Sequence, residues 1–288
     1  MDYFKFHEME IYWLVGGHTA LDGGAMFGVV PKPLWSRKYL VDEFNRIETP
    51  TDPLLIRYQN KNYLIDASIG TKLTDKQKKN YGVLTEPKLE ESLADIGLTV
   101  NDIDFILMTH FHFDHAGGLT KIVNDQIVST FPNATIYVHQ IEWDEVRNPN
   151  IRSKNTYFRQ NWEAIEHQVK PFSNNLKIKE SIEMIHTGGH SNGHCIVRLT
   201  QASDVIVHMA DLMATHAHQN PLWVMAYDDY PIDSIHMKQK YLMDGYKNGV
   251  IFSFYHDAFY RLIKWDSDGK EIVYSLKRGA EPIIKGVR

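Results

Sequence analysis

The sequence predicts an α+β fold, a β-sandwich flanked by helices in the order αββα. Two observations support this class. Short apolar runs of strand length dominate the 288 residues, whereas only a few segments carry helical spacing. Strands and helices also do not alternate regularly, as they would in a doubly wound parallel sheet. No repeat, low-complexity tract or linker divides the chain, so we expect one domain over residues 1–288.

The first half of the chain is expected to contain four strand regions and one helix. Residues 54–68 predict a hairpin, because two apolar runs flank the polar segment QNKN. Leucine and isoleucine recur at helical spacing over 88–98. The expected strand regions are 10–17, 54–68, 104–108 and 134–139, and a glycine-rich loop follows the first of them at 22–35.

The second half is expected to begin with a helical insertion over 142–169, a polar and aromatic stretch. After Pro231, apolar residues at helical spacing predict a helix over 232–249. The expected strands are 181–187, 195–200, 204–211, 250–257 and 271–277.

Composition excludes several classes of protein. The chain is 43% hydrophobic and 23% charged, with a net charge of −5, and no block of Lys or Arg suggests a nucleic-acid partner. Cys195 is the single cysteine, which excludes an internal disulfide and a cysteine-based zinc site. We find neither a signal-peptide pattern nor an apolar run of about 20 residues, so we expect a cytoplasmic protein without a membrane partner.

Residues 109–118, THFHFDHAGG, place three histidines and an aspartate within six positions after an apolar run. Side chains two apart in an extended segment point the same way, so His110 and His112 can bind one ion together. Asp114 and His115 follow where glycines let the backbone turn, and they can face a second ion. Imidazole and carboxylate groups are ordinary zinc ligands. The alternative is a histidine-rich loop that binds no metal. A single HxH pair would favour that alternative, whereas the longer HxHxDH pattern after an apolar run does not.

Three further ligand candidates each follow an apolar strand. His190 lies in HTGGHSNGH, Asp211 ends VIVHMAD, and His256 ends FSFYHD. With the first cluster they make five histidines and two aspartates, which is enough for two metal ions with Asp211 between them.

This ordered set resembles the metallo-β-lactamase superfamily. The resemblance implies that His110, His112 and His190 hold one metal ion, that Asp114, His115 and His256 hold a second, and that Asp211 bridges the two. It also implies that Asp66, in LIDAS, steadies the histidine loop. The cofactors expected are two divalent metal ions, most simply zinc, with manganese, cobalt or iron as alternatives. A redox diiron centre is disfavoured, because residue 112 is His where the diiron flavoprotein relatives carry Glu.

Residues 22–35, 153–164 and 210–231 are similar to the YtnP-type quorum-quenching lactonases, relatives of the N-acyl-homoserine lactonases. This similarity implies opening of the homoserine lactone ring by attack of a metal-bridging hydroxide. Asp114, or Asp211 as the second choice, would carry a proton to the leaving oxygen. A phosphotriesterase or general carboxylesterase of the same fold is the alternative, and a metal-stabilised binding protein without catalysis is a rival of another class.

One position departs from the lactonase pattern. Acyl-homoserine lactonases carry a tyrosine three residues after the bridging aspartate, and this chain has Ala214 there. The residues that could contact the substrate carbonyl instead are Thr215, His216, His218 and Tyr227. His216 and His218 are also candidates for orienting the metal ligands, because they lie close to Asp211 in the sequence.

A small-molecule lactone or ester with an apolar chain is the expected partner. Apolar side chains that could line a channel for it, or merely close the core, are Met26, Phe27, Trp35, Trp223, Met225 and Tyr227. Tyr157, Phe158 and Trp162 are candidates for a cover or a homodimer contact. Ser191 and Cys195 are the side-chain alternatives to a water nucleophile, but no GxSxG elbow surrounds the serine.

Overall fold

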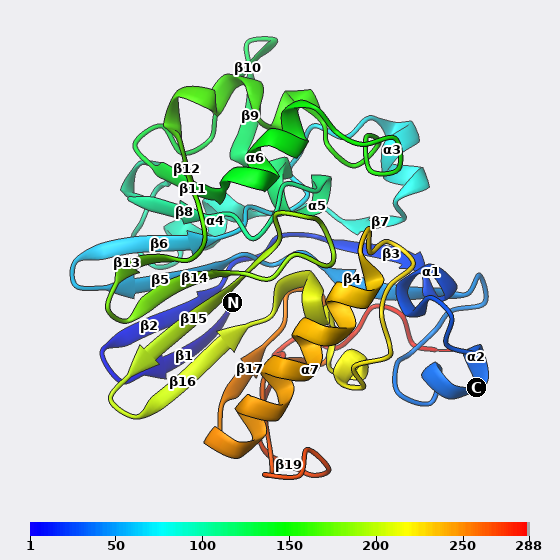
Figure 1. Cartoon of the computed structure of the whole chain (residues 1–288). Coiled ribbons are helices and arrows are strands. Elements are labelled where there is room, and N and C mark those ends of the chain that lie inside the picture. Colours follow the sequence, from blue (N-terminus) through cyan, green and yellow to red (C-terminus); the bar gives the residue numbers. More distant parts are fainter. Residues whose placement is uncertain (287–288) are drawn as a thin grey trace. The chain divides into compact units, whose positions relative to one another are not determined.

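The computed structural model describes residues 1–286, which form two compact units (Figure 1). Unit 1 comprises Met1–His18 and Thr51–Asn175. Unit 2 comprises Thr19–Pro50 and the residues from Leu176 onward. Two expectations stay predictions: that the chain forms one domain, and that residues 142–169 are an insertion.

Unit 1 is built on a seven-stranded mixed sheet with the order β1-β2-β5-β6-β8-β11-β12. Strands β6, β8, β11 and β12 run parallel to one another, whereas β1, β2, β5 and β6 pair antiparallel. The carboxyl ends of the parallel strands therefore meet at one edge of the sheet. The strands are β1 (Asp2–Phe6), β2 (Met9–Trp13), β5 (Leu54–Tyr58), β6 (Lys61–Ile65), β8 (Phe105–Leu107), β11 (Thr135–His139) and β12 (Val169–Phe172).

Short elements complete unit 1. Strands β9 (Thr120–Val123) and β10 (Gln126–Ser129) form a separate antiparallel hairpin, and β7 is Val83–Thr85. The helices are α3 (Asp75–Asn80), α4 (Leu89–Ala94), α5 (Phe113–Ala116) and α6 (Gln140–Arg147), and the 3₁₀ turns are η1 (Val100–Asp102), η2 (Gly117–Leu119), η3 (Arg159–Asn161) and η4 (Glu163–Gln168).

The core of unit 1 joins the sheet to its helices. Leu64, Ile106 and Ile136 from neighbouring strands share one apolar cluster with Leu93 of α4 and Trp143 of α6. Since Ile106 and Leu107 are both fully buried, β8 is covered on both faces, as expected of a central parallel strand. This packing fixes the end of β8, from which the histidine loop emerges.

Unit 2 holds a second seven-stranded mixed sheet, β13-β14-β15-β16-β17-β18-β19, in which only β16 and β17 are parallel. Its strands are β13 (Leu176–Lys179), β14 (Ile182–His186), β15 (Cys195–Gln201), β16 (Asp204–His208), β17 (Ile251–Ser253), β18 (Tyr260–Trp265) and β19 (Ile272–Lys277). The remaining elements are β3 (His18–Asp22), β4 (Arg46–Pro50), α1 (Gly23–Phe27), α2 (Lys32–Trp35), η5 (Ala210–Met213), η6 (His216–Gln219) and α7 (Pro231–Asn248).

The long helix α7, orange in Figure 1, packs on the sheet of unit 2. Tyr241 and Leu242 lie in one apolar cluster with Phe252 and Trp265 of the sheet. Pro231 begins the helix and Gly249, at φ 65°, caps its end, as the sequence signals predict.

The predicted α+β class is confirmed, and most expected elements are present. The hairpin at 54–68 has a two-residue turn, with Gln59 and Asn60 both at positive φ. Helix α4 ends at Ala94, earlier than predicted, because Gly97 is at φ 74° and the chain turns back. Nine strands lie outside the expected strand segments, namely β1, β3, β4, β7, β9, β10, β12, β13 and β18. Among the described residues no helix is long and apolar enough to span a bilayer.

Candidate metal centre

The loop after β8 brings the histidines of unit 1 together. His110 and His115 are fully buried, and His112 and Asp114 are almost so. The ring of His110 lies 4.5 Å from the ring of His112 and 4.0 Å from that of His115, measured between centroids. The short helix α5 carries Asp114 and His115, so these two side chains follow directly from the loop that holds the other two.

Two glycines allow this loop to pack closely on the segment after β6. A Cβ on Gly118 would lie 1.9 Å from the carbonyl oxygen of Ala67, and a Cβ on Gly117 would lie 2.0 Å from that of Ile69. No side chain fits at those distances. The sequence pattern predicts glycines here for a backbone turn, but the close approach of two backbone segments requires them more strongly.

Asp66, the residue after β6, ties the loop in place. Its buried carboxylate accepts hydrogen bonds from the backbone N–H of Thr109, the Thr109 hydroxyl and His115 Nδ1, each at 2.8 Å. Burial raises the pKa of Asp66, while His115 and the Thr109 bonds oppose that rise. Asp66 also stands at φ 57°, in the left-handed region that aspartate tolerates better than most residues.

In unit 2, Asp211 stands beside two histidines. His190 Nε2 lies 3.3 Å from Asp211 Oδ2, and His256 Nε2 lies 3.2 Å from Asp211 Oδ1. All three side chains are buried. One carboxylate oxygen thus faces each imidazole, which is the arrangement expected of a carboxylate shared by two ions.

The hydrogen bonds of the histidines suit a metal. His190 Nδ1 bonds to Asp228 Oδ1 at 2.9 Å, and His256 Nδ1 bonds to the carbonyl oxygen of Pro50 at 2.7 Å. Both partners accept, so each Nδ1 carries the hydrogen and each Nε2 presents a lone pair. In a neutral imidazole that lone pair faces a carboxylate oxygen at 3.2–3.3 Å, which is favourable only where a positive charge, either a metal ion or a proton on Nε2, lies between the two atoms. The donor set therefore fits divalent metal ions.

The same reasoning applies in unit 1. The Thr109 hydroxyl donates to Asp66, so at 3.1 Å it accepts from His110 Nδ1. His115 Nδ1 donates to Asp66 in the same way. Both rings therefore present Nε2 for coordination, with their other nitrogen fixed by a neighbour, as is usual for histidine ligands.

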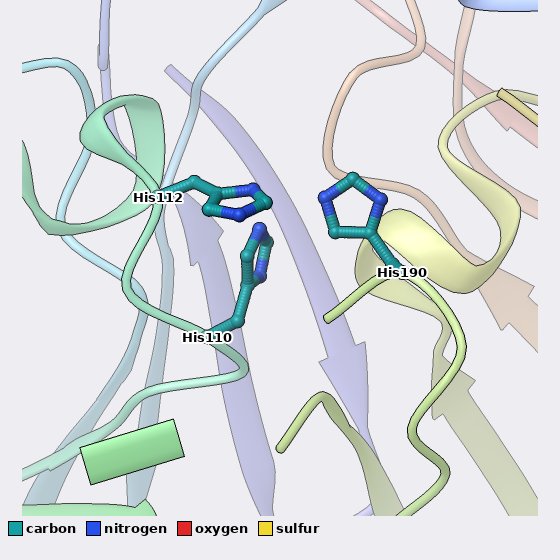
Figure 2. Close-up of side chains that lie close together, drawn as sticks. All are labelled: His110, His112 and His190. Atoms are coloured by element: carbon teal, nitrogen blue, oxygen red, sulfur yellow. The ribbon is translucent and has the colours of Figure 1, made fainter. Parts of the chain in front are cut away.

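The seven expected ligands fall into three groups of buried side chains, and within each group the ligand atoms lie within 4.8 Å of one another. Figure 2 shows the first of these groups, with its three imidazoles close together. The groups are His110, His112 and His190; His110, His115 and Asp211; and Asp114, His115 and His256. Such groups of His and Asp are able to bind metal ions.

Sequence reasoning missed residues that orient these ligands. Asp228 fixes His190, and the only local signal for it was the acidic pair at 228–229. His194 accepts a 3.3 Å hydrogen bond at Nε2 from the backbone N–H of Asp211. Asp257 follows His256, is fully buried and bonds to His216 at 2.6 Å. Burial alone would raise the pKa of Asp257, yet His216 and backbone N–H groups hold it below its usual value.

The expected substrate residues differ in their surroundings. Met26 and Phe27 are buried in an apolar cluster of unit 2 with Trp35 and Met225, so they close a core. Tyr227 is 40% exposed, and Trp223 packs at the margin of the same cluster. These last two keep the accessibility that contact with a substrate requires.

The candidates for contacting the substrate carbonyl also differ in their accessibility. His218 bonds through Nδ1 to the Thr215 hydroxyl and through Nε2 to the carbonyl oxygen of Met26, both at 2.8 Å, so both nitrogens of its ring are engaged. Thr215 is fully buried by the same contact. His216 remains partly exposed, which leaves it and Tyr227 as the more accessible candidates.

The alternative nucleophiles are both buried. Ser191 and Cys195 have no exposed surface, and Cys195 lies within β15, as expected of a small core residue. Neither is placed to meet a substrate from solvent.

Known proteins resemble this chain in sequence and fold. The family model of the metallo-beta-lactamase superfamily matches residues 46–243, which include six of the seven expected ligands and exclude His256. A probable metal-dependent hydrolase from Staphylococcus aureus is 44% identical, with a TM-score of 0.93 over 96% of this chain and 99% of that one. AidC, a dizinc quorum-quenching lactonase, shares the fold with a TM-score of 0.79 at 18% identity, over 98% of each chain.

Curated relatives match a smaller part of this chain than the solved structures do. An N-acyl homoserine lactonase of a Bacillus species is 26% identical over 110 residues, 38% of this chain and 38% of the lactonase. The chain thus spans no more than 38–40% of the length of the curated relatives it matches. Together, the extent of the family match and the 44% identity to a solved structure over 96% of this chain establish the family. The chain belongs to the metallo-β-lactamase superfamily and has its fold.

Proposed function

We propose that this metallo-hydrolase binds two divalent metal ions and opens the ring of N-acyl-homoserine lactones. The observation that carries the proposal is the pair of contacts made by Asp211, one carboxylate oxygen beside His190 and the other beside His256. A single ion would need only one of these oxygens. The resemblance to lactonases, at 26% identity over a limited length, supports the substrate class.

The ligands divide between the two ions as the grouping of side chains suggests. His110, His112 and His190 would hold the first ion, and Asp114, His115 and His256 the second. Asp211 would contact both. Zinc is the simplest choice for such His and Asp ligands, with manganese, cobalt or iron as alternatives. When bound, two such ions supply a water nucleophile that is active near neutral pH and a Lewis acid for the substrate carbonyl.

Protein side chains would perform the remaining steps. Ring opening converts the lactone to a carboxylate and an alcohol, so the departing ring oxygen must receive a proton. Asp114, 7% exposed and next to the ligand His115, is our first choice to hold and deliver that proton, with Asp211 as the second. Tyr227 and Trp223 would contact the substrate's apolar chain from their accessible positions.

Hydrolysis of phosphotriesters or simple carboxylic esters is the second candidate. Ala214 favours it, because a methyl group that is 1% exposed cannot bind a lactone carbonyl as the lactonase tyrosine does. The same metal ligands serve attack on carbon or on phosphorus.

The experiment compares kcat/KM of the metal-loaded protein on a homoserine lactone, an aryl ester and an organophosphate. The ratio kcat/KM is compared because it reports how tightly the enzyme binds each transition state. We expect it to be highest for the lactone. Asp211→Asn should lower lactone turnover by about a hundredfold or more and reduce the bound metal below two ions per chain. An organophosphate preference would favour the second candidate, and near-normal turnover by Asp211→Asn would contradict the shared role of Asp211.

A further inference from the structure

Glu142 is a fully buried carboxylate that none of the proposed steps uses. It is the third residue of α6 and has no exposed surface. Its Oε1 accepts a hydrogen bond from the backbone N–H of Phe111 at 2.8 Å and another from the Tyr157 hydroxyl at 2.9 Å. Burying a carboxylate costs free energy unless strong hydrogen bonds replace those that it made with water. These two hydrogen bonds therefore explain how Glu142 can be buried.

Both donors belong to the surroundings of the expected metal ligands. Phe111 lies between His110 and His112, so its amide group is part of the backbone that joins the two ligands. The ring of Tyr157 lies 5.1 Å from that of His112, centroid to centroid. One carboxylate oxygen therefore fixes the peptide between two ligands and an aromatic ring beside the second of them.

The sheet explains how Glu142 reaches this position. Strand β8, which precedes the histidine loop, lies between β6 and β11 and is parallel to both. Asp66 follows β6 directly and Glu142 follows β11 by three residues, so both arrive at the edge where the loop begins. Asp66 binds the loop at Thr109, and Glu142 binds it at Phe111.

We propose that Glu142, acting through the Phe111 amide and Tyr157, is a positioning residue that sets His110 and His112 for metal binding. With Asp66 it forms a two-sided carboxylate clamp on the histidine loop. Glu142 is not among the side chains that group as possible metal ligands. The proposal rests on the proposed function only in requiring that these histidines bind metal, and it is independent of which ester is cleaved.

The test measures metal affinity by competition with a chromophoric chelator, using Zn²⁺ and Co²⁺ on the full chain. Glu142→Gln keeps the shape but replaces the charged acceptor with a neutral one. We expect its dissociation constant for the ion held by His110 and His112 to rise roughly tenfold or more. Tyr157→Phe, which removes one of the two hydrogen bonds, should give a smaller rise in the same direction. Asp144→Asn, at an exposed position of the same helix, should leave affinity unchanged.

Thermal unfolding of the metal-free variants separates positioning from simple stability. A weaker metal site in Glu142→Gln, with a metal-free melting temperature close to that of Asp144→Asn, supports the proposal. Unchanged affinity in both Glu142→Gln and Tyr157→Phe overturns it, and Tyr157→Phe alone decides if Glu142→Gln does not fold. A wild-type protein that binds no metal would defeat both proposals, whereas one that binds two ions but leaves lactones intact would defeat only the lactonase assignment.

Discussion

At the scale of single residues, the candidate centre depends on which imidazole nitrogen carries a hydrogen. His110, His115, His190 and His256 each have Nδ1 bonded to an acceptor, and this leaves Nε2 as the ligand atom. The acceptors are a hydroxyl, two carboxylates and a main-chain carbonyl. Changes to these partners should act on metal binding even though none of them is an expected ligand.

Asp228→Asn tests this reasoning at His190. The new side-chain amide can donate to Nδ1, which would move the imidazole hydrogen to Nε2 and remove the ligand lone pair. We expect the affinity for one metal ion to fall about 10- to 100-fold, measured by metal titration. Asp268→Asn, an exposed change, serves as the control. Equal affinities in the two variants would contradict the role of Asp228.

His218 gives a prediction about pH. Burial, aided by the charge of Lys238, lowers the pKa of His218 from its ordinary value of 6.5 to about 3. Between these pH values the unfolded chain binds a proton that the folded chain does not. The contribution of His218 to stability is therefore complete above pH 6.5 and falls as the pH decreases, by at most about 1.4 kcal/mol per pH unit.

Urea unfolding of the metal-free protein at several pH values from about 7.5 to 5 would measure this effect. Wild type should lose more unfolding free energy over that range than His218→Gln, which has no titrating group at that position. His236→Gln, at an exposed position, should follow wild type. Parallel curves for wild type and His218→Gln would contradict the prediction.

At the scale of elements, the position of α5 depends on contact between two backbone segments. Turn η2 follows α5 directly and approaches residues 67–69 so closely that no Cβ fits at Gly117 or Gly118. The helix is only four residues long, and intrinsic propensity cannot hold so short a helix in place. Its position therefore follows from this packing and from the bonds made by Asp66.

Gly118→Ala should displace η2 and, with it, the ligands of α5. We expect a loss of at least about 1–3 kcal/mol of unfolding free energy, because the added carbon meets a backbone oxygen that cannot rotate away. The bound metal should decrease as well. Gly97→Ala is a useful comparison, since its φ of 74° is unfavourable but no atom lies within 4 Å of the new carbon. Chemical denaturation and metal analysis measure both effects, and a milder change at Gly118 than at Gly97 would contradict the argument.

At the scale of the whole molecule, the buried polar groups of the candidate centre should make stability depend on metal. Ions that bind the folded chain alone raise its stability by mass action, by about 4 kcal/mol at a thousand times the dissociation constant. Removing metal with a chelator should therefore lower the melting temperature, and adding Zn²⁺ back should restore it. Calorimetry checks this, and a melting temperature that is insensitive to chelation would contradict metal binding.

The sequence alone identified the α+β class, about half of the strands, helix α7 and all seven residues that group as side chains able to bind metal. These features were readable because they are local: His110 to His115 are adjacent, and each of the other ligands follows an apolar run. Tertiary structure alone decided which residues hold the ligands in place. Asp228 and Glu142 lie 38 and 31 positions from the groups they bind, and His256 is fixed by a carbonyl 206 positions away.

Burial was also decided only by the fold. Met26 and Phe27 belong to a glycine-rich stretch that sequence reasoning assigned to a substrate channel or to the core, and they pack into the core. The stretch 22–35, expected to be a loop, contains the short helices α1 and α2, and a helix of four or five residues is too short to show an apolar period from which burial could be inferred. Chemical identity of the ligands is therefore a property of the sequence, whereas their orientation and the accessible surface around them arise from contacts between distant segments.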